Sequence, residues 1–268
     1  MKRFIPYLIF VLMFPSLQAQ EKEASQEANA NNPLANLIAF NVQFNYLSNN
    51  TATDATTMVT SFRYAQPVGK FLIRATVPVM TSTSVESNSS MSGLGDINIF
   101  ATYLASDSSS PVQFGLGPMV FAPTSAVSQT GTGFENRNFG ANNWQVGAAA
   151  ILFVAKSKQF QYGGLFTYAA GVGNDSQTNM NATESLAALQ PFYFFQLGKG
   201  KYLRGAPIWT FDFDKQAYNM PVGIGIGQVF KVGSNVLNLF IEPQYSIYSQ
   251  GINQPIFQIF SSINMQFY

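Results

Sequence analysis

The few charged side chains that lie well inside strand-like segments of this chain share one face, opposite the more apolar residues. They are Arg63, Arg74, Asp96, Arg204 and Glu242. Guanidinium and carboxylate groups that meet in an interior form ion pairs, and removal of one partner leaves the other charge uncompensated. The same arginines could instead bind an anionic solute through charge-assisted hydrogen bonds. The sequence leaves both interpretations open.

The residue types exclude most catalytic chemistry, because the chain contains neither histidine nor cysteine. Serine hydrolases on membrane barrels need a histidine to activate the nucleophile. Metal hydrolysis through histidine or cysteine ligands is excluded for the same reason. Asp96 and Glu242 could form a carboxylate dyad only if they were close, and nothing in their positions brings them together. We therefore predict a protein that is not an enzyme, with no catalytic, cofactor-binding or metal-binding residues.

The elements that position these charges are strands of alternating polarity. Phe40, Val42 and Phe44, for example, alternate with Asn41 and Gln43, which places the two sets on opposite faces of a strand. Twelve such segments follow residue 36, over residues 37–47, 58–68, 71–81, 94–104, 112–122, 143–155, 160–172, 186–197, 202–211, 220–232, 236–247 and 254–268. In this register the five charged side chains point to the inner face.

The connections between these segments alternate in length. Short turns such as 69–70 and 198–201 alternate with longer loops such as 82–93 and 124–141, which are rich in small polar residues. Membrane barrels with an even strand number have this alternation, with short periplasmic turns and longer outer loops. A secreted sandwich is the alternative, but its strands are usually only about six residues long. The sequence therefore predicts an all-β fold, an up-and-down antiparallel transmembrane barrel of about twelve strands.

Composition agrees with a barrel in a membrane. Hydrophobic residues make up 47% of the chain, aromatic residues 15% and charged residues only 10%, whereas soluble domains have about 25% charged residues. A barrel hides this apolar surface against lipid by alternation, and its lumen holds uncharged polar groups. The formal net charge is +1, which gives no indication of nucleic-acid binding.

Both ends of the chain carry signals of export and assembly. Lys2 and Arg3 precede an apolar stretch over residues 4–17, and Ala19 offers a cleavage site. This stretch is shorter than the roughly 20 residues of a membrane-spanning helix, so we favour a signal peptide over a retained anchor. The predicted organisation is a signal peptide over residues 1–19, a mobile periplasmic tail over 20–35 and a barrel over 36–268.

The terminal segment is amphipathic and ends in aromatic residues. Its apolar register ends at Phe267, while Tyr268 falls on the polar side. Outer-membrane barrels commonly end in such a strand, which the barrel assembly machinery reads. We therefore predict that Phe267 and Tyr268 form the assembly signal.

The predicted inner face is mixed in character. Phe192 and Phe194 share a register with Gln190, and Gly223, Gly225 and Gly227 also face inward. Phenyl rings beside amides would suit an amphipathic or aromatic solute, or they could simply fill a narrow barrel. The inward glycines would allow strong coiling of their strand or close approach of a plug.

Several stretches together resemble a family of outer-membrane barrels named for the meta-pathway of phenol degradation, some members of which are labelled transporters or neuromedin U. The matching stretches, in chain order, are residues 32–46, 92–104, 114–124, 143–153, 206–213 and 221–233. The resemblance implies an outer-membrane location in a Gram-negative bacterium and transport of small compounds, aromatic ones among them. It provides no catalytic residues.

The sequence thus predicts an outer-membrane channel or facilitator for the passive passage of small solutes, with selectivity set by Arg63, Arg74, Asp96, Arg204 and Glu242. The alternative is a structural or adhesive barrel with a lumen filled by side chains, which acts through its outer loops. The expected partners are outer-membrane lipids, the barrel assembly machinery and a small-molecule solute of unknown identity.

Overall fold

The computed structural model describes residues 30–51, 55–84, 89–125, 139–141, 143–172 and 185–267, and the regular elements in these ranges are all β-strands. Within the described residues, no helix is long and apolar enough to span a bilayer. The strands are β1 (Ile38–Asn50), β2 (Thr56–Val68), β3 (Phe71–Ser84), β4 (Ser89–Leu94), β5 (Ile97–Leu104), β6 (Val112–Ala122), β7 (Trp144–Val154), β8 (Phe160–Val172), β9 (Leu186–Gly198), β10 (Lys201–Gly205), β11 (Trp209–Asp212), β12 (Ala217–Gly223), β13 (Gly225–Val232), β14 (Asn235–Gln250) and β15 (Pro255–Phe267).

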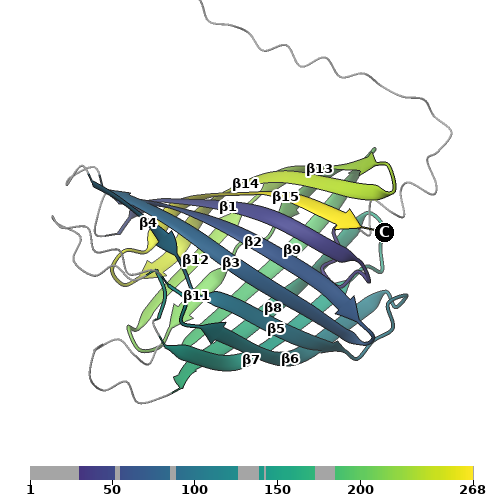
Figure 1. Cartoon of the computed structure of the whole chain (residues 1–268). Helices are drawn as coiled ribbons and strands as arrows, with labels where there is room; N and C mark the ends of the chain where they lie inside the picture. Colours follow the sequence, from purple (N-terminus) through teal and green to yellow (C-terminus); the bar gives the residue numbers. More distant parts are fainter. Residues whose placement is uncertain are drawn as a thin grey trace, which may run out of the picture.

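These strands form one closed antiparallel barrel. β1 pairs with both β2 and β15, and β15 pairs in turn with β14, so the sheet has no free edge between the first and last strands. β4 and β5 both pair with β3, β10 and β11 both pair with β9, and β12 and β13 both pair with β14. Each of these couples is one interrupted strand, and the barrel has twelve strands as the sequence predicts (Figure 1).

Three of the twelve strands are interrupted. Two of the breaks lie within predicted strands, and the third separates β5 from β4, most of which was predicted to be part of the loop over residues 82–93. Pro207 lies between β10 and β11, and proline has no N–H to donate to a ladder. Gly95 lies between β4 and β5, where an added Cβ would lie 2.9 Å from Cγ of Pro78. Ile224 separates β12 from β13. The chain continues in the same direction past each break, so the up-and-down order of the barrel is preserved.

The two ends of the barrel differ. Tight turns join β2 to β3 and β13 to β14, where Gly69 and Gly233 have φ angles of 59° and 64°, a conformation that other residues adopt only under strain. The start of β1 and the end of β15 lie at this same end, with Ile38 paired to Phe267 (Figure 1). We call it the short-turn mouth. The opposite end, which carries the longer connections, is the loop mouth.

The side chains are distributed in the reverse of a soluble protein. Large apolar residues face outward and are exposed, including Val222, Ile224 and Ile226 beside the inward glycines. Amide side chains such as Gln113 and Gln258 are buried on the inner face. This distribution is that of a barrel whose outer surface meets lipid.

The predicted tail over residues 20–35 needs a correction, because the structure places residues 30–37 inside the short-turn mouth. We call residues 30–37 the inner segment; residues 1–29 lie outside the described part of the chain. Leu34 is only 1% exposed, and the carbonyl oxygen of Ala30 accepts a hydrogen bond of 3.0 Å from Nε2 of Gln266. Polar composition suggested mobility in water, but the lumen is itself lined with amides and therefore accommodates polar residues.

Candidate functional site in the barrel lumen

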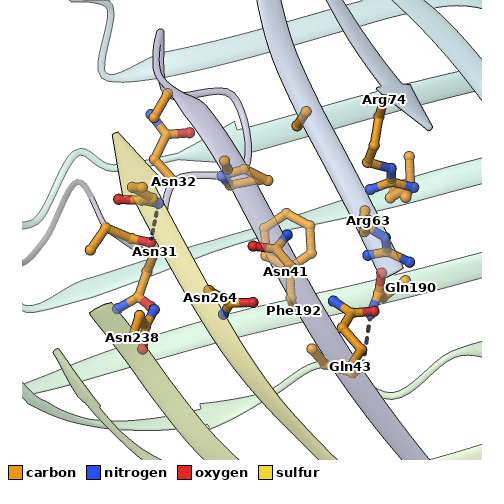
Figure 2. Close-up of a pocket in the computed structure, with 18 of the residues that line it drawn as sticks. Asn31, Asn32, Asn41, Gln43, Arg63, Arg74, Gln190, Phe192, Asn238 and Asn264 are labelled. Carbon is orange, nitrogen blue, oxygen red and sulfur yellow. Dashed lines mark hydrogen bonds between the residues drawn. The ribbon is translucent and has the colours of Figure 1, made fainter. Parts of the chain in front are cut away.

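A cavity of about 180 Å³ lies within the barrel and is lined from nearly all sides. Its polar lining residues are Asn31, Asn32, Asn41, Gln43, Arg63, Arg74, Gln190, Arg204, Asn238, Asn264 and Gln266. Its aromatic lining residues are Phe100, Phe192, Phe194, Phe240 and Phe260. None of the described lining residues is a carboxylate. Figure 2 shows the arginines and amides reaching into this space from different strands.

Arg204 and Glu242 form a buried ion pair across β10 and β14. The distance from Nε of Arg204 to Oε2 of Glu242 is 2.8 Å. The other carboxylate oxygen accepts two further hydrogen bonds of 2.8 Å, from the backbone N–H of Ala206 and from Nε2 of Gln244. Glu242 is fully buried, so every oxygen that lost water on folding has gained a donor.

Aromatic rings enclose the other side of Arg204. Its guanidinium carbon lies 3.4 Å from the ring centroid of Phe240, 5.5 Å from that of Phe260 and 5.7 Å from that of Phe194. A cation that stacks on ring faces gains electrostatic stabilisation, especially where water is excluded. The charge of Arg204 is therefore already balanced by Glu242 and shielded by rings, which makes it part of the wall of the cavity.

The inward glycines of β12 and β13 make room for this arrangement. An added Cβ at Gly223 would lie 2.6 Å from Cγ of Gln244. At Gly225 it would collide with the backbone and Cβ of Glu242, and at Gly227 with the ring of Tyr202. The groups nearest to these glycines belong to the neighbouring strands β10 and β14, and not to the plug that the sequence suggested.

Arg63 and Arg74 differ from Arg204 because the described part of the chain gives them no partner of opposite charge. Both are partly buried and line the cavity. In the ladder between β2 and β3, Arg63 is opposite Thr76 and Arg74 is opposite Ala65, so the arginines are diagonal neighbours on one face. The Nε atom of each is buried without a hydrogen-bond partner. Among the described residues, neither makes an ion pair.

Asp96 is buried but does not join the arginines around the cavity, and its role in selectivity stays a prediction. It lies in the break between β4 and β5 and is absent from the cavity lining. Its two oxygens accept hydrogen bonds from the backbone N–H groups of Ser125, at 3.0 Å, and Ala141, at 2.7 Å. These two N–H groups lie outside the strands and need an acceptor. Asp96 therefore holds both ends of the connection between β6 and β7 at the loop mouth.

The inner segment is tied to the wall by a chain of side-chain hydrogen bonds. The hydroxyl of Tyr202 donates to Oδ1 of Asn238 over 2.6 Å. Nδ2 of Asn238 donates in turn to Oδ1 of Asn31 over 3.0 Å, and both asparagines are labelled in Figure 2. On the other side, Nδ2 of Asn32 donates to Oε1 of Gln113 over 3.1 Å. The inner segment thus narrows the short-turn mouth and contributes directly to the cavity lining.

The mixed lining that the sequence indicated on β9 is present, with Phe192 and Phe194 both buried and facing the cavity. Three aromatic contributors were missed, namely Phe100, Phe240 and Phe260. Each lies on the inner face of its strand, and the alternating register was the signal that could have placed them there. The inner segment had no such signal, since it precedes the first strand.

The predicted assembly signal lies partly outside the described residues. Phe267 ends β15, is 39% exposed on the outer face and pairs with Ile38 in the ladder that closes the barrel. Tyr268 is not among the described residues. The role of these two residues in assembly stays a prediction.

Comparison with known proteins supports the fold but gives no family. No protein-family model matches the sequence, and no curated protein matches it. Two solved structures are similar to the barrel. The COG4313 outer membrane channel from Pseudomonas putida F1 has a TM-score of 0.66 at 14% sequence identity, with coverage of 87% of this chain and 96% of that chain. The NanC porin has a TM-score of 0.52 at 10% identity, with coverage of 85% and 99%.

At these identities the comparisons establish the architecture, which is the closed twelve-stranded antiparallel barrel that outer-membrane channels have. The predicted resemblance to the phenol-pathway family gains no support from the sequence comparisons. The solute and the role of the arginines must therefore be argued from the lumen itself.

Proposed function

We propose that the protein is an outer-membrane channel or facilitator for the passive passage of small solutes, and that it is not an enzyme. The main support is the cavity of about 180 Å³ inside a closed barrel, with arginine, amide and phenyl groups around it. A barrel needed only as a scaffold would gain from filling this space with packed apolar side chains. A polar interior is also typical of outer-membrane barrels that contain a water-filled channel.

The proposed location is the outer membrane of a Gram-negative bacterium, reached by export with a cleaved signal peptide over residues 1–19. The apolar outer face and the fold shared with outer membrane channels support this location. In this membrane the short-turn mouth would face the periplasm and the loop mouth the exterior. The partners would be the surrounding lipids and the barrel assembly machinery.

The proposed solutes are small and aromatic or amphipathic. In another protein, an apolar cavity of about 150 Å³ is large enough to bind benzene, so the cavity here has room for a single ring. Phe100 and Phe192 offer apolar contacts, while Gln43 and Gln190 offer hydrogen bonds. Such a combination orients a ring with a polar substituent better than it passes a hydrated ion.

A second candidate function is a filled barrel that acts through its outer loops. The observation in its favour is the inner segment, which occupies the short-turn mouth and holds Leu34 at 1% exposure. If this segment stays in place, solutes cross slowly or not at all. Conductance distinguishes the two functions.

The test is single-channel recording in planar bilayers with the exported protein, with heat-dependent gel mobility to verify folding. A variant that lacks residues 20–35 removes most of the inner segment, and a variant that lacks only 20–29 is the matched control. We expect small ohmic steps for the whole protein and for the control, and larger steps for the longer deletion. Folded proteins that stay silent in all three forms would refute the channel and favour the filled barrel.

A further inference from the structure

Among the residues that the structure describes, the charges inside the barrel do not balance. Arg204 is paired with Glu242, and Asp96 is bonded to two backbone N–H groups at the loop mouth. Arg63 and Arg74 remain without a carboxylate among the described residues. Positive groups that are partly withdrawn from water and unpaired are unfavourable. Two of them on one face therefore call for an anion that the described chain itself does not supply.

The spacing of the two arginines suits one small anion. Diagonal neighbours on adjacent antiparallel strands have Cβ atoms about 7–8 Å apart, a separation that two long side chains can close around a carboxylate. Asn41 of β1 is directly opposite Arg63 in the ladder and also lines the cavity, so its amide can add a third donor. Figure 2 shows Arg63, Arg74 and Asn41 directed into the same cavity.

Aromatic rings complete the site on its apolar side. The guanidinium carbon of Arg74 lies 4.0 Å from the ring centroid of Phe100, which fixes the plane of the guanidinium and leaves its edge for an anion. Phe192 lines the same cavity and is 6.4 Å from Phe153, ring centroid to ring centroid. A ring attached to a carboxylate would therefore have both a charged anchor and an apolar wall.

We propose that Arg63 and Arg74 bind the carboxylate of a small aromatic acid, whose ring lies against the phenyl-lined part of the lumen. This inference rests on the proposed channel and names the class of its solute. Guanidinium groups suit this task because their planar donors match the two oxygens of a carboxylate. Neutral aromatic compounds could not form the ion pairs with the two arginines. Small carboxylates without a ring could not make the apolar contacts with the phenyl groups.

Isothermal titration of the folded full-length barrel in detergent tests the site directly. The probes are benzoate, its neutral analogue benzamide, and acetate, which has the carboxylate without the ring. We expect benzoate to bind at least about tenfold more tightly than benzamide, which cannot make the hydrogen bonds between charged groups. We expect a similar difference from acetate, which lacks the apolar contacts of the ring. Equal affinity for benzoate and benzamide would overturn the anion site. Equal affinity for benzoate and acetate would overturn the aromatic part of the assignment.

Variants locate the binding within the barrel. Arg63→Gln and Arg74→Gln should each weaken benzoate binding about tenfold to a hundredfold, while Lys70→Gln, in the exposed turn of the same hairpin, should leave it unchanged. Undiminished binding in both arginine variants, with folding verified by gel mobility, would refute the site. The comparison of the three probes needs no variant, so misfolding of one variant does not remove the test.

The binding experiment and the conductance experiment can fail independently of each other. A barrel that conducts but binds benzoate and benzamide equally would refute the carboxylate site and leave the channel intact. A barrel that binds benzoate selectively but passes no current would refute the open channel and leave the site intact.

Discussion

Glu242→Gln tests whether the buried ion pair holds the wall of the barrel. The substitution keeps the volume of the side chain but removes its charge. Arg204 then stays buried among three phenyl rings without a counter-ion. Three donors, from Arg204, Ala206 and Gln244, converge on the two carboxylate oxygens, and an amide offers only one oxygen to them.

The expected loss of unfolding free energy is about 3 kcal/mol, the lower end of the range of about 3–5 kcal/mol for breaking a buried pair by removing one partner. The lower end applies because the side chain of Arg204 is still 7% exposed to the lumen. Arg204→Gln combined with Glu242→Gln removes the uncompensated charge as well. The double variant should therefore be more stable than Glu242→Gln alone.

The assay is guanidinium unfolding of the barrel in phospholipid vesicles, followed by the fluorescence of Trp144 and Trp209, the two tryptophans of the chain. The slope against denaturant should be unchanged, so that the shift in midpoint reports stability alone. The reasoning is refuted if Glu242→Gln unfolds at the same denaturant concentration as the original protein. It is also refuted if the double variant loses the sum of the two single losses.

Three further predictions concern packing, the loop mouth and assembly. Gly227→Ala forces a Cβ against a buried ring and should cost about 1–3 kcal/mol of unfolding free energy, measured by the same guanidinium titration. Asp96→Ala should speed hydrogen exchange of the two amides it binds by about tenfold or more, with little change in global stability. Removal of residues 267–268 should leave the exported chain unfolded in the periplasm, as protease digestion of whole cells and gel mobility would show.

Each of these predictions has a control or an outcome that would refute it. Gly164 is also a strand glycine, on the outward face of β8, and an added Cβ there meets no atom closer than 3.7 Å, so Gly164→Ala should be nearly neutral. Equal losses at Gly164 and Gly227 would refute the packing argument. Unchanged exchange in Asp96→Ala would show that the loop is held by other contacts. Normal insertion of the truncated chain would disprove the assembly signal.

The strands could be predicted from the sequence because each strand of a barrel wall has a pattern that its own residues show. Side chains that alternate between lipid and lumen impose a period of two on each strand, and this pattern alone placed Arg63, Arg74, Arg204 and Glu242 on the inner face. Ion pairs among the inner charges were one of the two interpretations that the sequence allowed. The particular pair of Arg204 and Glu242 could not be assigned from the sequence, because it depends on which distant strands lie close together.

The inner segment and Asp96 show where a local pattern has no information. Residues 30–35 are polar, and polarity in a terminal segment predicts mobility only if the alternative is an apolar core. Here the alternative is a lumen with amides such as Asn238, which bonds the segment as water would. Asp96 lies on the inner face of its segment, but its carboxylate accepts hydrogen bonds from two backbone donors that are distant in the sequence, which a local pattern cannot indicate.

We therefore assign two different roles to the arginines of the lumen, one to Arg204 and another to Arg63 and Arg74, according to the residues that surround each of them. Arg204 is paired with the carboxylate of Glu242, contacts three aromatic rings and is almost fully buried. Its charge therefore stabilises the wall of the barrel. Arg63 and Arg74 have neighbouring positions and no anion among the described residues, so theirs is available to a solute. A channel that kept every charge paired would have a rigid interior without preference for any ion. A channel that kept none paired would repel its own strands. Under the proposed function, the neutralised arginine on β10 stabilises the wall, and the two arginines on β2 and β3, which have no ion pair among the described residues, make the lumen selective.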